Sequence, residues 1–180
     1  MLSGDFSQYN TSSYGDNAAI NFDMMMGDGS TASSAYDENG NIKAMKQWGV
    51  KLNSSDLIDD LTYAYSFNGS TFTNKLLNVI DVKNDNQTKL GDFRTSSLHP
   101  VQNKNAGTVD YTYDVNGNLK KDLNKDIGSN SMDGIEYNHL NLPWKITVKS
   151  ATGDKGTITY VYDATGNKIT KTTGGISLLG

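Results

Sequence analysis

A short motif that recurs along the chain constrains its fold more than any other feature of the sequence. The motif is Tyr-Asp-x-x-Gly-Asn, and full copies begin at Tyr36, Tyr113 and Tyr162. A degenerate copy begins at Tyr137, and a weaker one begins at Tyr65. Self-similarity at a period of roughly 20–50 residues is typical of repeat architectures. The residues that define the motif are Tyr36, Asp37, Gly40, Asn41, Tyr113, Asp114, Gly117, Asn118, Tyr137, Tyr162, Asp163, Gly166 and Asn167.

Each copy of the motif predicts a β-hairpin. Apolar side chains precede the motif at every second position, as at Ile158, Tyr160 and Tyr162, which is the period of one strand face. We call the five residues Asp-x-x-Gly-Asn the corner. The corner Asp can accept hydrogen bonds from backbone N–H groups further along, and the Gly can adopt a left-handed backbone. A second strand is expected after each corner, for example from Ile169 to Thr173.

Hairpins in series predict an all-β fold. A single hairpin is only marginally stable in water, whereas tandem hairpins can align and bury their aromatic faces together. We therefore expect tandem antiparallel β-hairpins that form a curved extended sheet, or a partial β-shell. The expected organisation is an irregular lead-in at 1–35 with a strand near 17–26, a hairpin array at 36–173 with an irregular loop near 82–108, and a tail at 174–180.

Charge and composition argue against several classes of partner. The formal net charge is −4, and Arg94 is the only arginine among 16 basic residues. Nucleic-acid-binding surfaces are usually basic and rich in arginine, so we expect no nucleic-acid partner. No segment approaches the run of about 20 apolar residues that spans a membrane, and the first residues lack the pattern of a signal peptide. The absence of cysteine excludes disulfides and cysteine-based zinc sites.

The corners carry oxygen atoms at alternate positions, as calcium-binding loops do. Asp114, Asn116 and Asn118 show this spacing. A calcium loop of the EF-hand type requires a glycine at its sixth position and a bidentate glutamate at its twelfth. Here Gly117 is at the fourth position and Lys125 at the twelfth, which favours a turn over a metal site. We expect no metal and no cofactor.

Few residues suggest catalysis. His99 precedes a proline in a polar loop, His139 lies inside the degenerate motif, and neither belongs to a known catalytic signature. Asp56, Asp59 and Asp60 form the densest acidic group in the sequence. Two of them could perform acid–base chemistry only if they met across a cleft, and solvated charge is the simpler interpretation. We therefore expect no catalytic residue and no enzymatic activity.

Two tryptophans carry the main alternative to a purely structural role. Trp48 and Trp144 both follow a corner, within or beside an expected second strand. Exposed, they could stack on sugar rings, which would indicate a carbohydrate-binding or adhesion module. The alternation of apolar residues around them favours burial in the core instead.

The motif resembles the YD repeats of the Rhs and teneurin-like superfamily. Besides the motif itself, Leu90–Ser96 and Tyr137–Pro143 are similar to stretches of bacterial Rhs proteins, the second in the style of Bacteroidetes members. The resemblance covers most of the chain, from about Ile20 to Thr173. It implies a β-sheet that spirals into a hollow shell, in a protein that is secreted or displayed on the cell surface.

The resemblance also implies a role and a partner. The expected function is a non-catalytic structural segment that scaffolds or encapsulates an effector domain. The expected partners are the remainder of the parent protein, or another copy of the chain, through the edges of strands. The chain holds too few units to close a shell, and no effector or self-cleavage signature is visible in it. Glycans remain the alternative partner.

Overall fold

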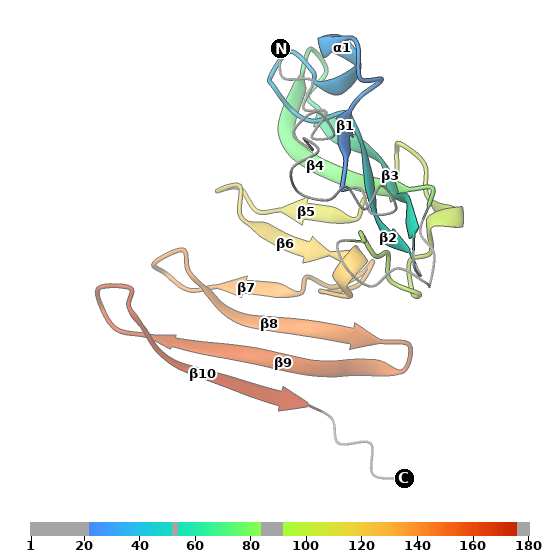
Figure 1. The fold of residues 1–180 in the computed structure, drawn as a ribbon. Coiled ribbons are helices and arrows are strands. Elements are labelled where there is room, and N and C mark those ends of the chain that lie inside the picture. Colours follow the sequence, from blue (N-terminus) through green and yellow to red (C-terminus); the bar gives the residue numbers. More distant parts are fainter. Residues whose placement is uncertain (1–21, 52–53, 84–91, 176–180) are drawn as a thin grey trace, which may run out of the picture. The chain divides into compact units, whose positions relative to one another are not determined.

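Antiparallel strands dominate the computed structural model of the chain, which describes residues 22–51, 54–83 and 92–175 (Figure 1). The predicted all-β class is confirmed. The chain divides into two units: the first includes residues up to Thr95 together with Val101–Thr108, and the second includes Ser96–Pro100 and the chain from Val109. The helical elements among the described residues are three or four residues long.

The first unit is built on a four-stranded antiparallel sheet with the strand order β1-β2-β3-β4. A single helical turn follows β1, and a 3₁₀ turn follows the sheet at Val101–Asn103. The elements are β1 (Met24–Met26), α1 (Ala32–Ala35), β2 (Ala44–Lys51), β3 (Ser54–Phe67) and β4 (Phe72–Asp81). The strand expected near 17–26 is thus present as β1, and residues 17–21 lie outside the described part of the chain.

A small apolar core holds the first unit together. Ile58 and Leu61 on β3 and Val79 on β4 are each no more than 3% exposed. Burying a side chain of this size contributes about 1.5–3 kcal/mol. Gly49 on β2 makes room for Ile58, because a Cβ atom at Gly49 would lie 2.7 Å from the Ile58 Cδ1 atom.

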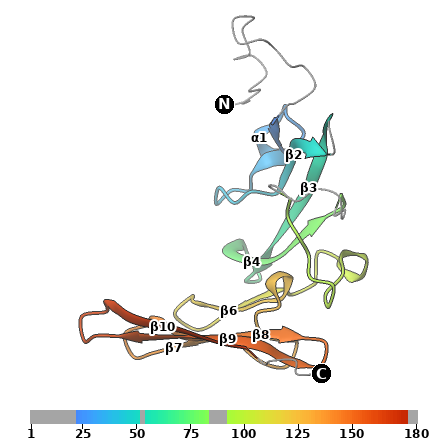
Figure 2. The same cartoon turned by 60° about the horizontal axis from the view of Figure 1, so that its bottom comes forward.

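The second unit consists of successive hairpins (Figures 1 and 2). β5 and β6 form a two-stranded sheet, and β7 to β10 form a four-stranded antiparallel sheet in the order β10-β9-β8-β7. The elements are β5 (Tyr111–Tyr113), β6 (Leu119–Asp122), a 3₁₀ turn (Leu123–Lys125), β7 (Ile135–Tyr137), β8 (Pro143–Ser150), β9 (Gly153–Tyr162) and β10 (Lys168–Gly175). β10 thus extends to Gly175, beyond the array end predicted at residue 173.

The hairpins of the second unit share one strand register. In each, the tyrosine before the corner pairs with the residue directly after it, which we call the exit residue. The next residue, Lys120, Trp144 or Ile169, is an extra residue that the pairing of the two strands skips, as in a β-bulge. The paired residues are Tyr113 with Leu119, Tyr137 with Pro143, and Tyr162 with Lys168.

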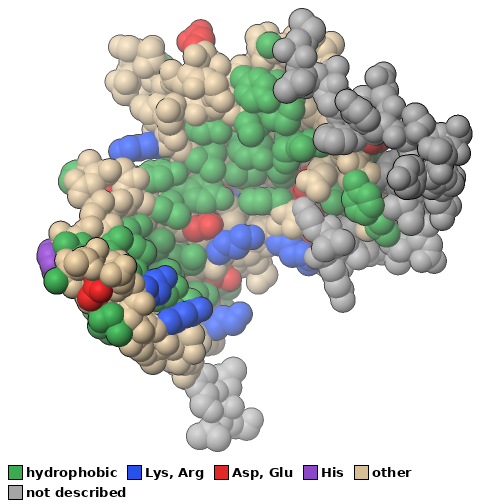
Figure 3. All heavy atoms as spheres, turned by 60° about the vertical axis from the view of Figure 1, so that its left-hand side comes forward, with side chains coloured by type: hydrophobic (Ala, Val, Ile, Leu, Met, Phe, Trp, Pro, Cys, Tyr) green, Lys and Arg blue, Asp and Glu red, His purple; other side chains and the backbone are tan. Residues whose placement is uncertain are grey.

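Complete burial of apolar side chains is rare in the second unit. Among its described residues, Leu123 and Ile135 are the buried hydrophobic side chains, whereas every residue of β10 is exposed. Large apolar side chains such as Val161 (54% exposed) and Ile169 (64% exposed) face solvent. Hydrophobic side chains also reach the surface in the space-filling view (Figure 3). A layered domain would cover such a sheet face with a second layer.

Candidate functional site

The corners are the most regular feature of the molecule. In the corner that begins at Asp114, one carboxylate oxygen accepts hydrogen bonds from the backbone N–H groups of Asn116 and Asn118, at 2.9 and 2.8 Å. The other oxygen accepts from the Asn118 side-chain amide at 2.8 Å. The Gly117 N–H donates to the Asp114 carbonyl at 3.1 Å. A single carboxylate therefore organises the whole turn.

The corners at Asp37 and Asp163 have the same hydrogen bonds, residue for residue. Their glycines have left-handed backbones, with φ of +80° at Gly40 and +89° at Gly166, and φ is +87° at Gly117. A residue with a Cβ atom adopts this conformation at a cost, which explains why the motif contains glycine.

The degenerate corner at residues 138–142 has the same backbone with different side chains. Asn138 replaces the Asp, and its Oδ1 atom accepts from the N–H groups of Leu140 and Leu142, both at 3.0 Å. Asn141 replaces the Gly and has φ of +63°. Leu142 replaces the last Asn and has no amide to donate. The weaker copy at Tyr65 differs, because its hairpin turns at residues 68–71.

Electrostatics supports a structural role for the corner carboxylates. Hydrogen bonds from the Asn167 side chain, from Thr165 and from the Asn167 backbone lower the pKa of Asp163 to about 2. The Asn118 side chain is the main cause of the lowered pKa of Asp114. At Asp37, burial raises the pKa but is outweighed by hydrogen bonds, first from Asn41. Among the oxygens considered as calcium ligands, those of the corner aspartates accept these N–H groups, as expected for a turn.

Tyrosine hydroxyls link successive hairpins of the second unit. The Tyr137 Oη atom donates to the Leu119 carbonyl at 2.8 Å, and the Tyr162 Oη atom donates to the Pro143 carbonyl at 2.8 Å. Leu119 and Pro143 are both exit residues. Each tyrosine therefore reaches back to the same position of the preceding hairpin. Sequence analysis missed these bonds, although the tyrosine directly before each corner was visible as a signal.

Side-chain amides also join neighbouring corners. The Asn118 Nδ2 atom donates to the Asn141 Oδ1 atom at 2.6 Å, and the Asn141 Nδ2 atom donates to the Asn118 Oδ1 atom at 3.2 Å. In the first unit, the Asn41 Nδ2 atom donates to the Thr73 carbonyl on β4 at 3.2 Å. The corner asparagines thus bond both within a hairpin and to the next segment.

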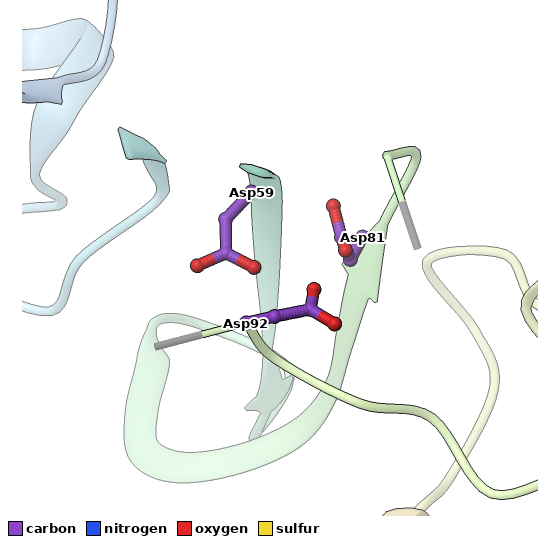
Figure 4. A group of neighbouring side chains, drawn as sticks. All are labelled: Asp59, Asp81 and Asp92. Atoms are coloured by element: carbon purple, nitrogen blue, oxygen red, sulfur yellow. The ribbon is translucent and has the colours of Figure 1, made fainter. Parts of the chain in front are cut away.

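The second feature of note is a group of three aspartates in the first unit (Figure 4). Asp59 on β3, Asp81 at the end of β4 and Asp92 each place a carboxylate oxygen within 4.8 Å of the others. The Phe93 N–H donates to the Asp59 Oδ1 atom at 2.8 Å, and the Arg94 guanidinium lies 3.1 Å from the Asp92 carboxylate. Sequence analysis grouped Asp59 instead with Asp56 and Asp60.

The sequence-based acidic group does not come together in the structure. Asp56 forms an ion pair with Lys51 at 3.5 Å, and Asp60 forms one with Lys46 at 3.7 Å. Asp60 directly follows Asp59 on β3 and so points to the opposite face of the sheet, whereas Asp56 lies further along the strand, opposite Gly49. Burial, and then the nearby carboxylates Asp81 and Asp92, raise the pKa of Asp59, opposed by the Phe93 N–H.

Such an aspartate group can in principle share a proton or bind a hard cation, because carboxylate oxygens are ligands of Ca²⁺ and Mg²⁺. Arg94 already supplies one positive charge beside Asp92. The geometry therefore defines an acidic group with a local counter-charge and does not by itself define a metal centre.

The remaining candidate residues are the two histidines and the two tryptophans. His99 is half-buried after the Ser96 turn, and His139 is exposed inside the degenerate corner. Trp48 on β2 is half-buried. Trp144 is 37% exposed, so the expectation of a buried side chain is wrong there. The reason is that Trp144 is the extra residue of a β-bulge, which interrupts the alternation on which the expectation was based.

Comparisons of the chain with protein-family models and with curated proteins found no match. Among the described residues, no helix has the length and apolar character needed to cross a membrane.

Proposed function

We propose that the chain is a non-catalytic structural segment of a secreted or surface protein of the Rhs/YD-repeat type. Its hairpins would form part of a sheet that scaffolds or encloses another domain. The observation that carries this proposal is the equivalence of successive corners, linked by tyrosine hydroxyls that bond to exit-residue carbonyls at 2.8 Å. A one-dimensional array needs such a contact between neighbours, repeated in the same form.

The use of the polar side chains supports this role. The carboxylates of Asp37, Asp114 and Asp163 accept hydrogen bonds from the corners' own N–H groups, and so serve the backbone. A catalytic carboxylate is instead held in reach of a substrate, with a pKa near the working pH. The corner aspartates differ from such a carboxylate, because the fold lowers their pKa values.

The thin core of the second unit supports the same proposal. Apolar side chains such as Val161 and Ile169 remain exposed on a sheet of four strands. Contiguous apolar patches, rather than single exposed residues, mark surfaces that contact other protein, and these two side chains lie on the neighbouring strands β9 and β10. In a shell, they would face an enclosed domain or neighbouring turns of the sheet.

Fractionation of the native source tests the proposal. An antibody against the 19.6 kDa chain should detect a longer polypeptide in the medium or at the cell surface. Limited proteolysis of intact cells should degrade this polypeptide if it is surface-displayed. Detection of the chain only inside cells, as a free species of its own mass, would contradict the proposal.

A carbohydrate-binding or adhesion module is the second candidate function. The exposed Trp144 favours it, because a tryptophan that is 37% exposed on a strand offers part of its ring face to a sugar. The Lys145 Nζ atom lies 5.8 Å from the centre of that ring. A glycan array should show binding that is lost in Trp144→Ala and kept in Trp48→Ala, since Trp48 is half-buried. No binding, or equal loss in both variants, would exclude a Trp144 platform.

A further inference from the structure

The last hairpin of the second unit repeats the hairpin before it. β8 (Pro143–Ser150) and β10 (Lys168–Gly175) both have eight residues, and both begin directly after a corner. Their first residues are 25 positions apart in the sequence. β9 follows β8 after two residues and pairs with it, and the tyrosine at its end donates to the Pro143 carbonyl. β8 therefore shows what a strand in the position of β10 can bind.

The exit residues form a series. Leu119, Pro143 and Lys168 occupy the same register, because each pairs with the tyrosine of its own corner. The carbonyls of the first two accept the hydroxyl of the tyrosine that precedes the next corner along the chain. Lys168 is the third member, and in the described part of the chain no tyrosine follows it.

β10 is available for such a contact. It forms the edge of its sheet among the described residues, and each of its eight residues is exposed. The outer edge of an antiparallel strand presents N–H and C=O groups that can pair with another strand. The Lys168 side chain lies over the Tyr160 ring, 3.9 Å from its centre, and so folds back onto its own hairpin.

We propose that the outer edge of β10 binds the first strand of one further hairpin in the same polypeptide, and that this hairpin carries the same Tyr-Asp-x-x-Gly-Asn motif. The hydroxyl of the tyrosine in that motif donates to the Lys168 carbonyl. This inference rests on the proposed function and specifies its partner and contact atom. A following hairpin of the same polypeptide is favoured over a second copy of the chain, because both observed tyrosine bonds join consecutive hairpins. The tyrosines that precede the corners of these hairpins are 24 or 25 residues apart.

An extended chain tests the inference. A second copy of residues 151–175 is inserted after Gly175, which leaves the rest of the chain unchanged and places a copied Tyr162 after β10. Hydrogen–deuterium exchange then reports the protection of the β10 amides. In the extended chain, the outward-facing amides of β10 should exchange at least about tenfold more slowly than in the original chain.

Two substitutions within the inserted copy separate the tyrosine bond from strand pairing. Tyr162→Phe in the copy should reduce β10 protection about 2- to 12-fold, as expected for one net hydrogen bond. Tyr160→Phe in the copy is the matched control, because no hydrogen bond of the Tyr160 hydroxyl is found among the described residues. The control should leave protection unchanged.

The outcomes distinguish the inference from the proposed function. Slow exchange that is insensitive to Tyr162→Phe in the copy would overturn the Lys168 contact and leave the scaffold function standing. An inserted copy that gives β10 no protection would overturn both, because the sheet would then not propagate. Protection of β10 in the original chain that grows with protein concentration would identify a second copy as the occupant and overturn the inference.

Discussion

The corner glycines allow a test in which one physical effect stands alone. At Gly117, φ is +87°, and a Cβ atom built on this residue meets nothing within 4 Å. Gly117→Ala therefore introduces no collision. Its cost comes from the left-handed backbone, which is unfavourable for a residue with a Cβ atom by about 1–2 kcal/mol.

The cost is measurable by urea or thermal unfolding. A loss of about 1–2 kcal/mol corresponds to a fall in Tm of roughly 2–8 °C for a chain of this size. Gly117→Asn should cost less than Gly117→Ala, because asparagine tolerates this backbone and Asn141 adopts φ of +63° in the equivalent position. Gly175→Ala is the control, since Gly175 lacks a left-handed φ and its added Cβ would make an ordinary 3.9 Å contact.

Two results would refute the reasoning. If Gly117→Ala were as stable as the original chain, the corner would not be held in the left-handed conformation in solution. If Gly117→Asn were as costly as Gly117→Ala, backbone strain could not be the cause, and a role for the glycine in contact with another molecule would have to be considered.

Three further predictions concern side chains. Tyr137→Phe should lower the free energy of unfolding by about 0.5–1.5 kcal/mol through loss of the bond to the preceding hairpin, whereas Tyr160→Phe should change it little in the same urea titration. Because the pKa of Asp59 is raised in the fold, its ionisation destabilises the protein as pH rises above about 4; Asp59→Asn should flatten this dependence and stabilise the chain at pH 7. Because the pKa of Asp163 is lowered to about 2, its stabilisation is complete above about pH 4 and is lost towards pH 2, and unfolding of Asp163→Asn should lack this acid-side loss.

Much of the fold was readable from local sequence. The period-two pattern before Tyr113 and Tyr162 predicted strands, and both tyrosines end one. The Asp-x-x-Gly-Asn corners were predictable because their hydrogen bonds join residues no more than four positions apart. Such bonds depend on the side chains within the motif and on the conformational freedom of glycine.

Contacts between segments that lie far apart in the sequence were not readable in this way. The hydroxyl of Tyr137 bonds to a carbonyl 18 residues earlier, and any backbone can offer a carbonyl, so the sequence carries no mark of the acceptor. Asp92 approaches Asp59 from 33 positions away, whereas the sequence neighbours Asp56 and Asp60 do not join Asp59 in that group.

The sequence by itself thus determined the corners at Asp37, Asp114 and Asp163 and the strands that end at Tyr113 and Tyr162, because these depend on interactions within a few residues. The tertiary structure alone decided which side chains meet across hairpins and that Trp144 is exposed. The physical reason is that register and β-bulges arise from pairing between strands, and a shift of one residue moves a side chain to the opposite face of a sheet.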